Sequence, residues 1–178
     1  MRGKTPIFPV EPLNNFSVTF QVTVPFTYGP RVRQISMIST EPAAGTPAVV
    51  TGWGASSSNN TTLPSQLQAV EVNITVRTTC STAYAPERAI TVNMICAGVA
   101  GLGICNGDFV GPLVVRGQLA GIASWGIGCA DGQHPGVYTN VAKIQEFCYS
   151  SNWRAIICQC NTLSLTLEEN FKRYEQIN

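Results

Sequence analysis

Charged residues are scarce in this chain. Lysine, arginine, aspartate and glutamate make up 12% of its 178 residues, about half of the roughly 25% that is usual in soluble proteins. The formal net charge is +1, so no electrostatic argument favours nucleic acid or an anionic membrane as a partner. Apolar runs long enough to cross a bilayer are also missing. We therefore expect neither a nucleic-acid-binding protein nor a membrane protein.

Histidine, the commonest general base in enzymes, occurs once. His134 stands in a loop just before Pro135, where a surface position is the simplest interpretation. The alternative is a Cys–His pair with Cys105 or Cys129, but those cysteines are better explained as bridged, as described below. The sequence thus offers little histidine chemistry.

Glycine, proline and cysteine are plentiful, with 16, 11 and 7 residues. Together with the low charge, they favour many short strands and turns over long surface helices. Seven cysteines indicate an oxidising compartment. Residues 1–9 start basic but contain no apolar signal core, so no signal peptide is visible in this chain. We expect a secreted, extracellular glycoprotein, with N-glycosylation sequons that begin at Asn15, Asn59, Asn60 and Asn73.

Hydrophobic periodicity predicts several strands. Apolar and polar residues alternate over residues 17–24 and again over 70–76, which is typical of half-buried strands. Residues 119–125 form an apolar strand. A capping-box pattern, Thr166-Leu-Glu-Glu, predicts a short helix over 167–176, although the tail could equally be an unpacked extension.

The most informative stretch is residues 103–113, Gly-Ile-Cys-Asn-Gly-Asp-Phe-Val-Gly-Pro-Leu. It resembles the active-site loop of trypsin-like serine proteases, Cys-x-Gly-Asp-Ser-Gly-Gly-Pro-Leu, at six positions. Three further segments resemble strands of that family's C-terminal barrel: Val49-Val-Thr-Gly-Trp-Gly, Met94-Ile-Cys-Ala-Gly and Gly136-Val-Tyr-Thr-Asn-Val. The resemblance runs from about residue 16 to residue 149.

This resemblance implies an all-β fold. We expect one antiparallel six-stranded Greek-key barrel of the trypsin-like type, with a short helix at 79–84 and a C-terminal helix at 141–149. The strand at 17–24 would be an orphan strand of the family's first barrel. Residues 1–36 are then a remnant of that barrel and a linker, residues 37–150 the C-terminal barrel, and residues 151–178 a tail without family match.

The residues that carry the family's chemistry are not intact. Phe109 stands at the position of the nucleophile, and a phenyl ring has neither a nucleophile nor a transferable proton. The following glycine is Val110. Phe16, or Asn15 after a one-residue slip, stands at the position of the triad aspartate. Loss of the whole triad leaves only about 10³–10⁴-fold catalysis over water.

Two backbone features of the loop could survive. The resemblance implies an oxyanion-hole remnant at the N–H groups of Gly107 and Phe109. It also implies that Asp108 would pair with a freed N-terminal amine, as in active family members. No such amine is recognisable here, so Asp108 must find other donors or the loop stays zymogen-like.

The binding residues resemble the family more closely than the catalytic ones do. Ser124, Trp125 and Gly126 resemble the strand edge along which a substrate backbone pairs. Gly126 and Gly136 resemble the small residues that keep the specificity pocket open. These residues could equally persist as barrel scaffold alone.

The predicted base of this pocket is uncharged. Gly103 stands where trypsins carry an acidic residue, so the pocket would not select arginine or lysine. Ile104 would make its floor apolar. Phe109 would point into or across the cleft and could plug it.

The resemblance implies two disulfides, Cys80–Cys96 and Cys105–Cys129, each worth roughly 3 kcal/mol by chain entropy. A third family bridge is lost on both sides, since Ala48 and Val115 occupy its positions.

Three cysteines remain. Cys148, Cys158 and Cys160 are odd in number, so one is free or pairs between chains. They lack a fourth ligand for zinc, and we expect no metal and no cofactor.

Three hypotheses of function follow. The first is a catalytically inactive pseudo-protease, a binding or regulatory module whose partner is a protease-pathway protein or a peptide segment. The second is a serine-type endopeptidase whose gene product is truncated here, and the third is a non-functional relic. Phe109 argues against the second, because truncation does not explain an internal substitution.

Overall fold

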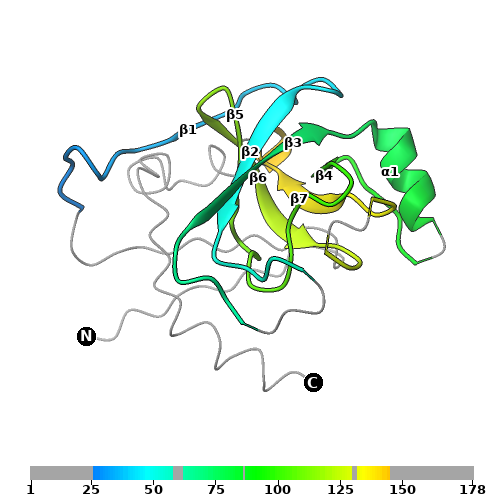
Figure 1. Cartoon of the computed structure of the whole chain (residues 1–178). Helices are drawn as coiled ribbons and strands as arrows, with labels where there is room; N and C mark the ends of the chain where they lie inside the picture. The colour runs from blue at the N-terminus through cyan, green and yellow to red at the C-terminus, as the bar shows by residue number, and fades with distance from the viewer. Residues whose placement is uncertain (1–25, 58–61, 86, 130–131, 145–178) are drawn as a thin grey trace, which may run out of the picture.

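Six antiparallel strands form a closed barrel in the computed structural model, which describes residues 26–57, 62–85, 87–129 and 132–144 (Figure 1). Their order around the barrel is β6-β5-β2-β3-β4-β7, and pairing of β6 with β7 closes it. The predicted fold is therefore confirmed. The strands are β2 (Pro47–Gly52), β3 (Gln68–Ile74), β4 (Met94–Gly98), β5 (Pro112–Val115), β6 (Gln118–Trp125) and β7 (Gly136–Asn140).

Several predictions fall outside the described residues. These are the strand at 17–24, the helix at 167–176 and the tail that contains it. The domain bounds at residues 36 and 150 stay predictions. Of the terminal helix, residues 141–144 are helical and the rest is outside. The individual residues in question are Asn15, Phe16, Asn59, Asn60, Cys148, Cys158 and Cys160.

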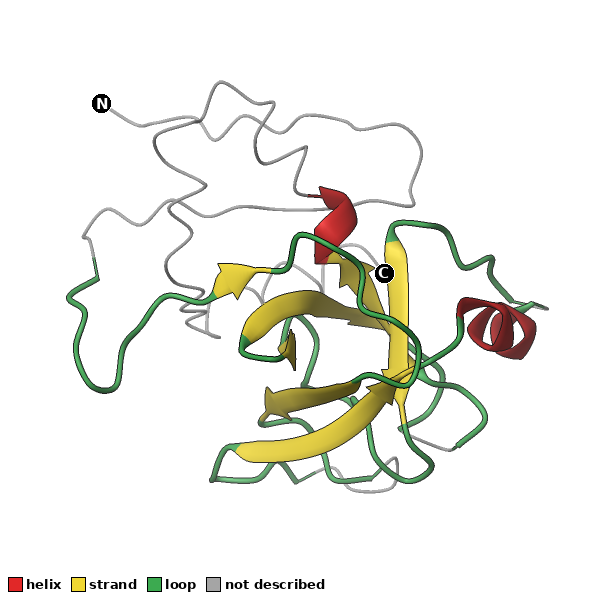
Figure 2. Ribbon diagram, turned by 90° about the horizontal axis from the view of Figure 1, so that it is seen from above, coloured by secondary structure: helices red, strands yellow, loops and turns green. Residues whose placement is uncertain are grey.

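Two small elements flank the barrel on opposite sides (Figures 1 and 2). Strand β1 (Ser36–Met37) pairs in parallel with β6, so the predicted linker contains a short strand. Helix α1 (Arg77–Tyr84) confirms the predicted short helix and begins two residues earlier. The Cys80–Cys96 disulfide ties α1 to β4, as the resemblance implied.

The core follows from side-chain alternation. In β2 and β3, Ala48, Val50, Val72 and Ile74 are buried, whereas the intervening side chains face outward. A six-stranded barrel is narrow enough for such side chains to fill it. The main cluster is completed by Ile95, Ala97, Ile104, Leu113, Val115, Ala120, Ala123 and Tyr138.

Strands β5 and β6 form a tight hairpin. Val115 pairs with Gln118 across two residues, Arg116 and Gly117, whose φ angles are 49° and 76°. Positive φ at both central positions is the signature of the type I′ turn, whose twist matches that of the strands. The hairpin therefore returns β6 alongside the end of the 103–111 loop.

Ala48 and Val115 face each other across the β2–β5 pair. Val49 pairs with Val114 and Val50 with Leu113, which places Ala48 directly opposite Val115. Both side chains are buried in the main cluster. The structure thus places the two side chains together, as expected for the positions of a lost bridge.

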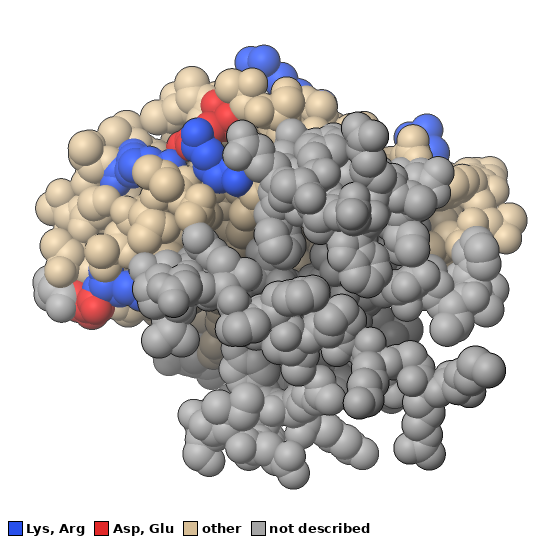
Figure 3. Space-filling view, turned by 180° about the vertical axis from the view of Figure 1, so that it is seen from behind, with Lys and Arg blue, Asp and Glu red and all other residues tan. Residues whose placement is uncertain are grey.

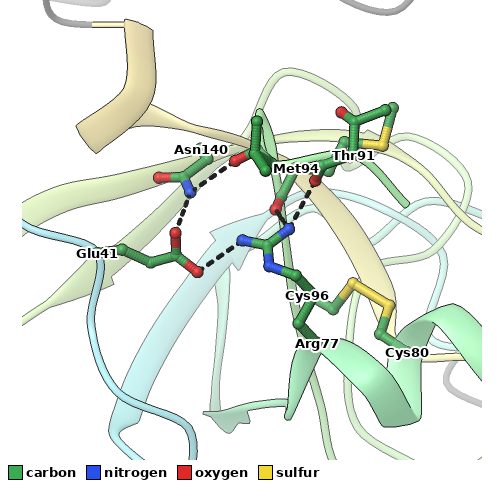
Figure 4. Close-up of polar contacts among 8 residues, drawn as sticks. Glu41, Arg77, Cys80, Thr91, Met94, Cys96 and Asn140 are labelled. Atoms are coloured by element: carbon green, nitrogen blue, oxygen red, sulfur yellow. Dashed lines mark hydrogen bonds and ion pairs between the residues drawn. A yellow bond between two sulfur atoms is a disulfide. The ribbon is translucent and has the colours of Figure 1, made fainter.

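Three polar residues, Glu41, Arg77 and Asn140, form what we call the Glu41 cluster (Figure 4). The cluster connects the loop before β2 to the start of α1 and the end of β7. Arg77 forms a 2.7 Å ion pair with Glu41 and donates to the carbonyls of Thr91 and Met94 at 2.6 and 2.8 Å. Asn140 donates to the second Glu41 oxygen at 2.8 Å. Both carboxylate oxygens of Glu41 are thereby satisfied.

Charged side chains are few on the described part of the surface seen from behind (Figure 3). Among the described residues, no helix is both long and apolar enough to span a membrane.

Candidate functional site

The 103–111 loop is fixed at both ends. The Cys105–Cys129 disulfide is present as the resemblance implied. At the other end, the Ala123 N–H donates to the Gly111 carbonyl, and the Val110 N–H donates to the Ala123 carbonyl, both at 2.8 Å. The loop is therefore anchored to β6 by backbone hydrogen bonds.

Asp108 accepts hydrogen bonds from backbone groups. Its Oδ1 accepts from the Gly54 N–H at 2.8 Å, and its Oδ2 from the Cys105 N–H at 3.1 Å. The absence of side chains at Gly52 and Gly54 makes room for it, because a β-carbon at either would collide with the carboxylate. In the described part of the chain Asp108 forms no ion pair. Both carboxylate oxygens of Asp108 thus have a backbone donor.

Phe109 lies at the mouth of a cavity instead of filling it. Its side chain is 49% exposed, and it is one of the residues that line the cavity. The ring occupies the nucleophile's place in the loop without blocking the space beside it.

Val110 carries backbone strain. Its φ is 69°, in the left-handed region where a β-branched residue is an outlier. The family pattern has glycine at this position, which adopts such an angle without steric conflict. Its anchoring hydrogen bond to Ala123 holds it there.

The two N–H groups of the predicted oxyanion hole remain available. In the described part of the chain, no residue accepts a hydrogen bond from the N–H of Gly107 or Phe109. The N–H groups of the alternating residues, Asp108 and Val110, are both bonded. The loop therefore keeps two unused donors beside the position of Phe109.

The cavity has a volume of about 160 Å³. Of the predicted pocket residues, Ile104 and Gly126 line it. The buried Ile104 supplies the apolar surface expected there. None of the described side chains that line it is charged. The described residues of the lining are Ile104, Cys105, Asn106, Phe109, Gly126, Gly128 and Cys129.

Four predicted pocket residues do not line this cavity: Gly103, Ser124, Trp125 and Gly136. Gly136 lies behind Ile104, since a β-carbon on it would come within 2.8 Å of Ile104 Cγ1. Trp125 instead packs against Tyr84 of α1. Ser124 is exposed at the end of β6, and Gly103 is only partly buried.

Four lining residues were not among the predicted pocket or cleft residues: Cys105, Asn106, Gly128 and Cys129. The Cys105–Cys129 pair was a usable signal, because the bridge holds the segment around Cys129 against the 103–111 loop and so forms part of the cavity wall. The contributions of Asn106 and Gly128 follow only from the path of the backbone.

Tyr138 lies in the barrel core next to this site. Its hydroxyl is buried and has no hydrogen-bond partner in the described part of the chain. Burial, and secondarily the negative charge of Asp108, raises the pKa of the phenol well above its usual value. Tyr138 therefore stays neutral at physiological pH.

The aromatic side chains next to the cavity form a second feature. Tyr84 meets Trp125 edge-on, with ring centroids 4.8 Å apart, and its hydroxyl donates to the Pro135 carbonyl at 2.8 Å. The His134 ring lies tilted against Tyr84 at 5.4 Å.

Across the described residues, no group of three or more histidine, cysteine, aspartate or glutamate side chains is arranged to hold a metal ion.

Comparison with known proteins agrees with this geometry. A sequence model of the family described as Trypsin matches residues 13–148. Trypsin beta of Drosophila erecta is 46% identical over 117 residues, which are 65% of this chain and 46% of that protein. Trypsin alpha of Drosophila melanogaster is 42% identical over 126 residues, 70% of this chain and 49% of that protein. The chain thus spans about half the length of these relatives.

A solved structure shares the fold. Neuropsin, a serine protease expressed in the limbic system of mouse brain, superposes with a TM-score of 0.66 and 34% sequence identity. The superposition covers 70% of this chain and 56% of neuropsin.

Proposed function

Because the chain belongs to the trypsin family of serine proteases, we propose that it is a catalytically inactive member that binds a peptide segment of a protein in a protease pathway. The observation that carries this proposal is Phe109. The loop around it keeps its disulfide and its anchoring hydrogen bonds, while the side chain at the reacting position has no nucleophile.

Three features support peptide binding. The cavity beside Phe109 has a volume of about 160 Å³ and an uncharged lining, which suits an apolar side chain. The N–H groups of Gly107 and Phe109 have no acceptor among the described residues. Beyond Ala123, no strand among the described residues pairs with β6 on its β5 side, so an extended peptide could pair there.

Covalent labelling tests the catalytic half of the proposal. The full chain is incubated with a fluorophosphonate probe that reacts with activated serines, with bovine trypsin as positive control. We expect trypsin to be labelled and this chain to stay unlabelled. Labelling of this chain would instead support the endopeptidase alternative, which the identity to fly trypsins favours.

Peptide affinity tests the binding half. Capped, fluorescein-labelled alanine hexapeptides with one phenylalanine are titrated by fluorescence anisotropy. Gly126→Val should weaken binding at least about tenfold by narrowing the cavity. The variant should still fold, because the atom nearest to the new β-carbon is 3.6 Å away.

The matched control is Gly29→Val, since Gly29 has open space around it and does not line the cavity. Equal affinity in all three proteins would contradict binding through the cavity. A lysine in place of phenylalanine should bind more weakly, because no acidic side chain lines the cavity.

Secretion and glycosylation are part of the same proposal. The two disulfides suit an oxidising compartment, and Asn73 is an exposed sequon residue in β3. Expression through a secretory pathway should give a glycosidase-sensitive mass, and Asn73→Gln should remove the part contributed at that site. An unchanged mass in the variant would contradict modification of Asn73.

A further inference from the structure

An arginine lies over the aromatic side chain that precedes the cavity residue Gly126 in the chain. The guanidinium carbon of Arg88 is 4.9 Å from the ring centroid of Trp125. Trp125 is in turn supported edge-on by Tyr84. The backbone N–H of Arg88 donates to the Tyr84 carbonyl at 2.9 Å. Tyr84 therefore fixes both the Trp125 ring and the backbone of Arg88. The guanidinium group is therefore held in a defined position.

The donors of this guanidinium are unused. The ion pair between Arg77 and Glu41 is the one recorded among the described residues, and Arg88 makes no side-chain hydrogen bond there. A guanidinium that stacks on a ring through its face keeps its N–H groups in the plane, pointing away from the ring. Such a fork binds a carboxylate through two parallel hydrogen bonds.

Arg88 lies over a side chain at the end of β6. Trp125 is the last residue of β6, and the next residue, Gly126, lines the cavity. Trp125 pairs with Val137 of β7, whereas no described residue pairs with the β5 side beyond Ala123. A peptide strand on that edge with one side chain in the cavity would therefore continue past Trp125 towards Arg88.

Arg88 supplies a positive charge at the end of β6. None of the described residues that line the cavity is charged, so these side chains do not distinguish acidic from neutral peptides by charge. A positive group next to a neutral cavity creates selectivity at a neighbouring peptide position.

We propose that Arg88, stacked on Trp125, selects peptide segments that carry an acidic side chain a few residues from the apolar side chain bound in the cavity. This inference rests on the proposed function, since it requires a peptide on the β6 edge. It names the class of partner: an extended segment with one apolar anchor and one carboxylate.

The test compares matched peptides on the full chain. Each capped alanine hexapeptide carries one phenylalanine and one glutamate, placed two, three or four residues before or after it. Each has a partner with glutamine instead of glutamate. Affinities are measured by anisotropy at low and high salt. We expect one spacing to bind about fivefold tighter with glutamate than with glutamine, with a smaller preference at high salt.

Three variants locate the effect. Arg88→Gln should remove the glutamate preference and leave the affinity for the glutamine peptide within about twofold. Arg88→Lys keeps the charge but loses the fork, and should retain only part of the preference. Arg116→Gln, in the turn at the other end of β6, should leave the preference unchanged.

The outcomes separate the two proposals. Equal binding of both peptides, a preference that survives Arg88→Gln, or an equal loss in Arg116→Gln would overturn the role of Arg88 and leave peptide binding standing. Failure of every peptide to bind would overturn both proposals.

Discussion

The Glu41 cluster and the Asp108 site are two half-buried anionic sites, and they are stabilised differently. Glu41 faces a cation, Arg77, which also donates to two backbone carbonyls. Asp108 faces only two backbone N–H groups. A side-chain cation therefore stabilises the carboxylate of Glu41, whereas backbone N–H groups stabilise the carboxylate of Asp108.

This difference explains how the loop keeps its shape with phenylalanine at position 109. The donors to Asp108 are main-chain groups of Gly54 and Cys105, which no substitution at residue 109 removes. The anchors of the loop to Ala123 are also main-chain bonds. The backbone contacts that hold the loop are therefore compatible with phenylalanine at the position of the family's nucleophile.

The largest effect on stability should come from a disulfide between β2 and β5, the strands next to the Asp108 site. Ala48→Cys with Val115→Cys should form a disulfide, because the two residues are directly opposed across β2 and β5. Since β2 leads into Gly54 and β5 follows the loop, the bridge would stabilise this side by up to about 4 kcal/mol. Urea unfolding of the oxidised and reduced variant measures it. A bridge that forms without raising stability would contradict the opposed geometry.

Removal of the Arg77 cation should destabilise the Glu41 cluster. Arg77→Ala leaves the carboxylate of Glu41 and two carbonyls without their donor, which should lower the free energy of unfolding by about 2–3 kcal/mol after allowance for partial exposure. Lys143→Ala, an exposed cation, is the matched control and should change stability by less than about 0.5 kcal/mol. Equal effects in the two variants would show that the cluster contributes nothing specific.

The corresponding change at the second site should be somewhat smaller. Asp108→Ala removes the acceptor of the Gly54 and Cys105 N–H groups and should destabilise by about 2 kcal/mol. Asp108→Asn keeps one acceptor oxygen and should lose about half as much. Glu71→Ala, on the exposed face of β3, controls for the change in net charge. If Asn and Ala variants were equally unstable, charge rather than hydrogen bonding would dominate the site.

The smallest effect concerns strain within the loop. Val110→Gly should raise stability by about 1 kcal/mol, because the φ of 69° suits glycine, and the half-exposed side chain loses little packing. Val49→Gly is the control, since Val49 has similar exposure in a regular strand, and it should lower stability by a comparable amount. Destabilisation in both variants would argue against strain at Val110.

The strands and bridges were largely predictable from the sequence. Short-range alternation located β3, and an apolar run located β6, each within two residues of the observed bounds. The family resemblance implied both observed disulfides and the short helix. Such features depend on side-chain period and on fixed motif spacing, which the linear sequence retains.

Two of the six residues predicted to form the pocket line the cavity, and the other four lie elsewhere for a physical reason. Ile104 and Gly126 line the cavity, but Trp125 and Gly136 do not. Their orientation depends on what each packs against, and Tyr84 and Ile104 come from other elements of the barrel. Periodicity places a residue on a strand without naming its long-range neighbours.

The sequence by itself determined that this chain has a trypsin-like barrel and that residue 109 cannot be a nucleophile, since both follow from residue identity within a motif. Only the tertiary structure decided how Asp108 is satisfied and where the Arg88 guanidinium lies. The N–H of Gly54 is 54 positions away from Asp108, and Arg88 reaches Trp125 from beyond the end of α1. Contacts over such separations exist only once the barrel has closed.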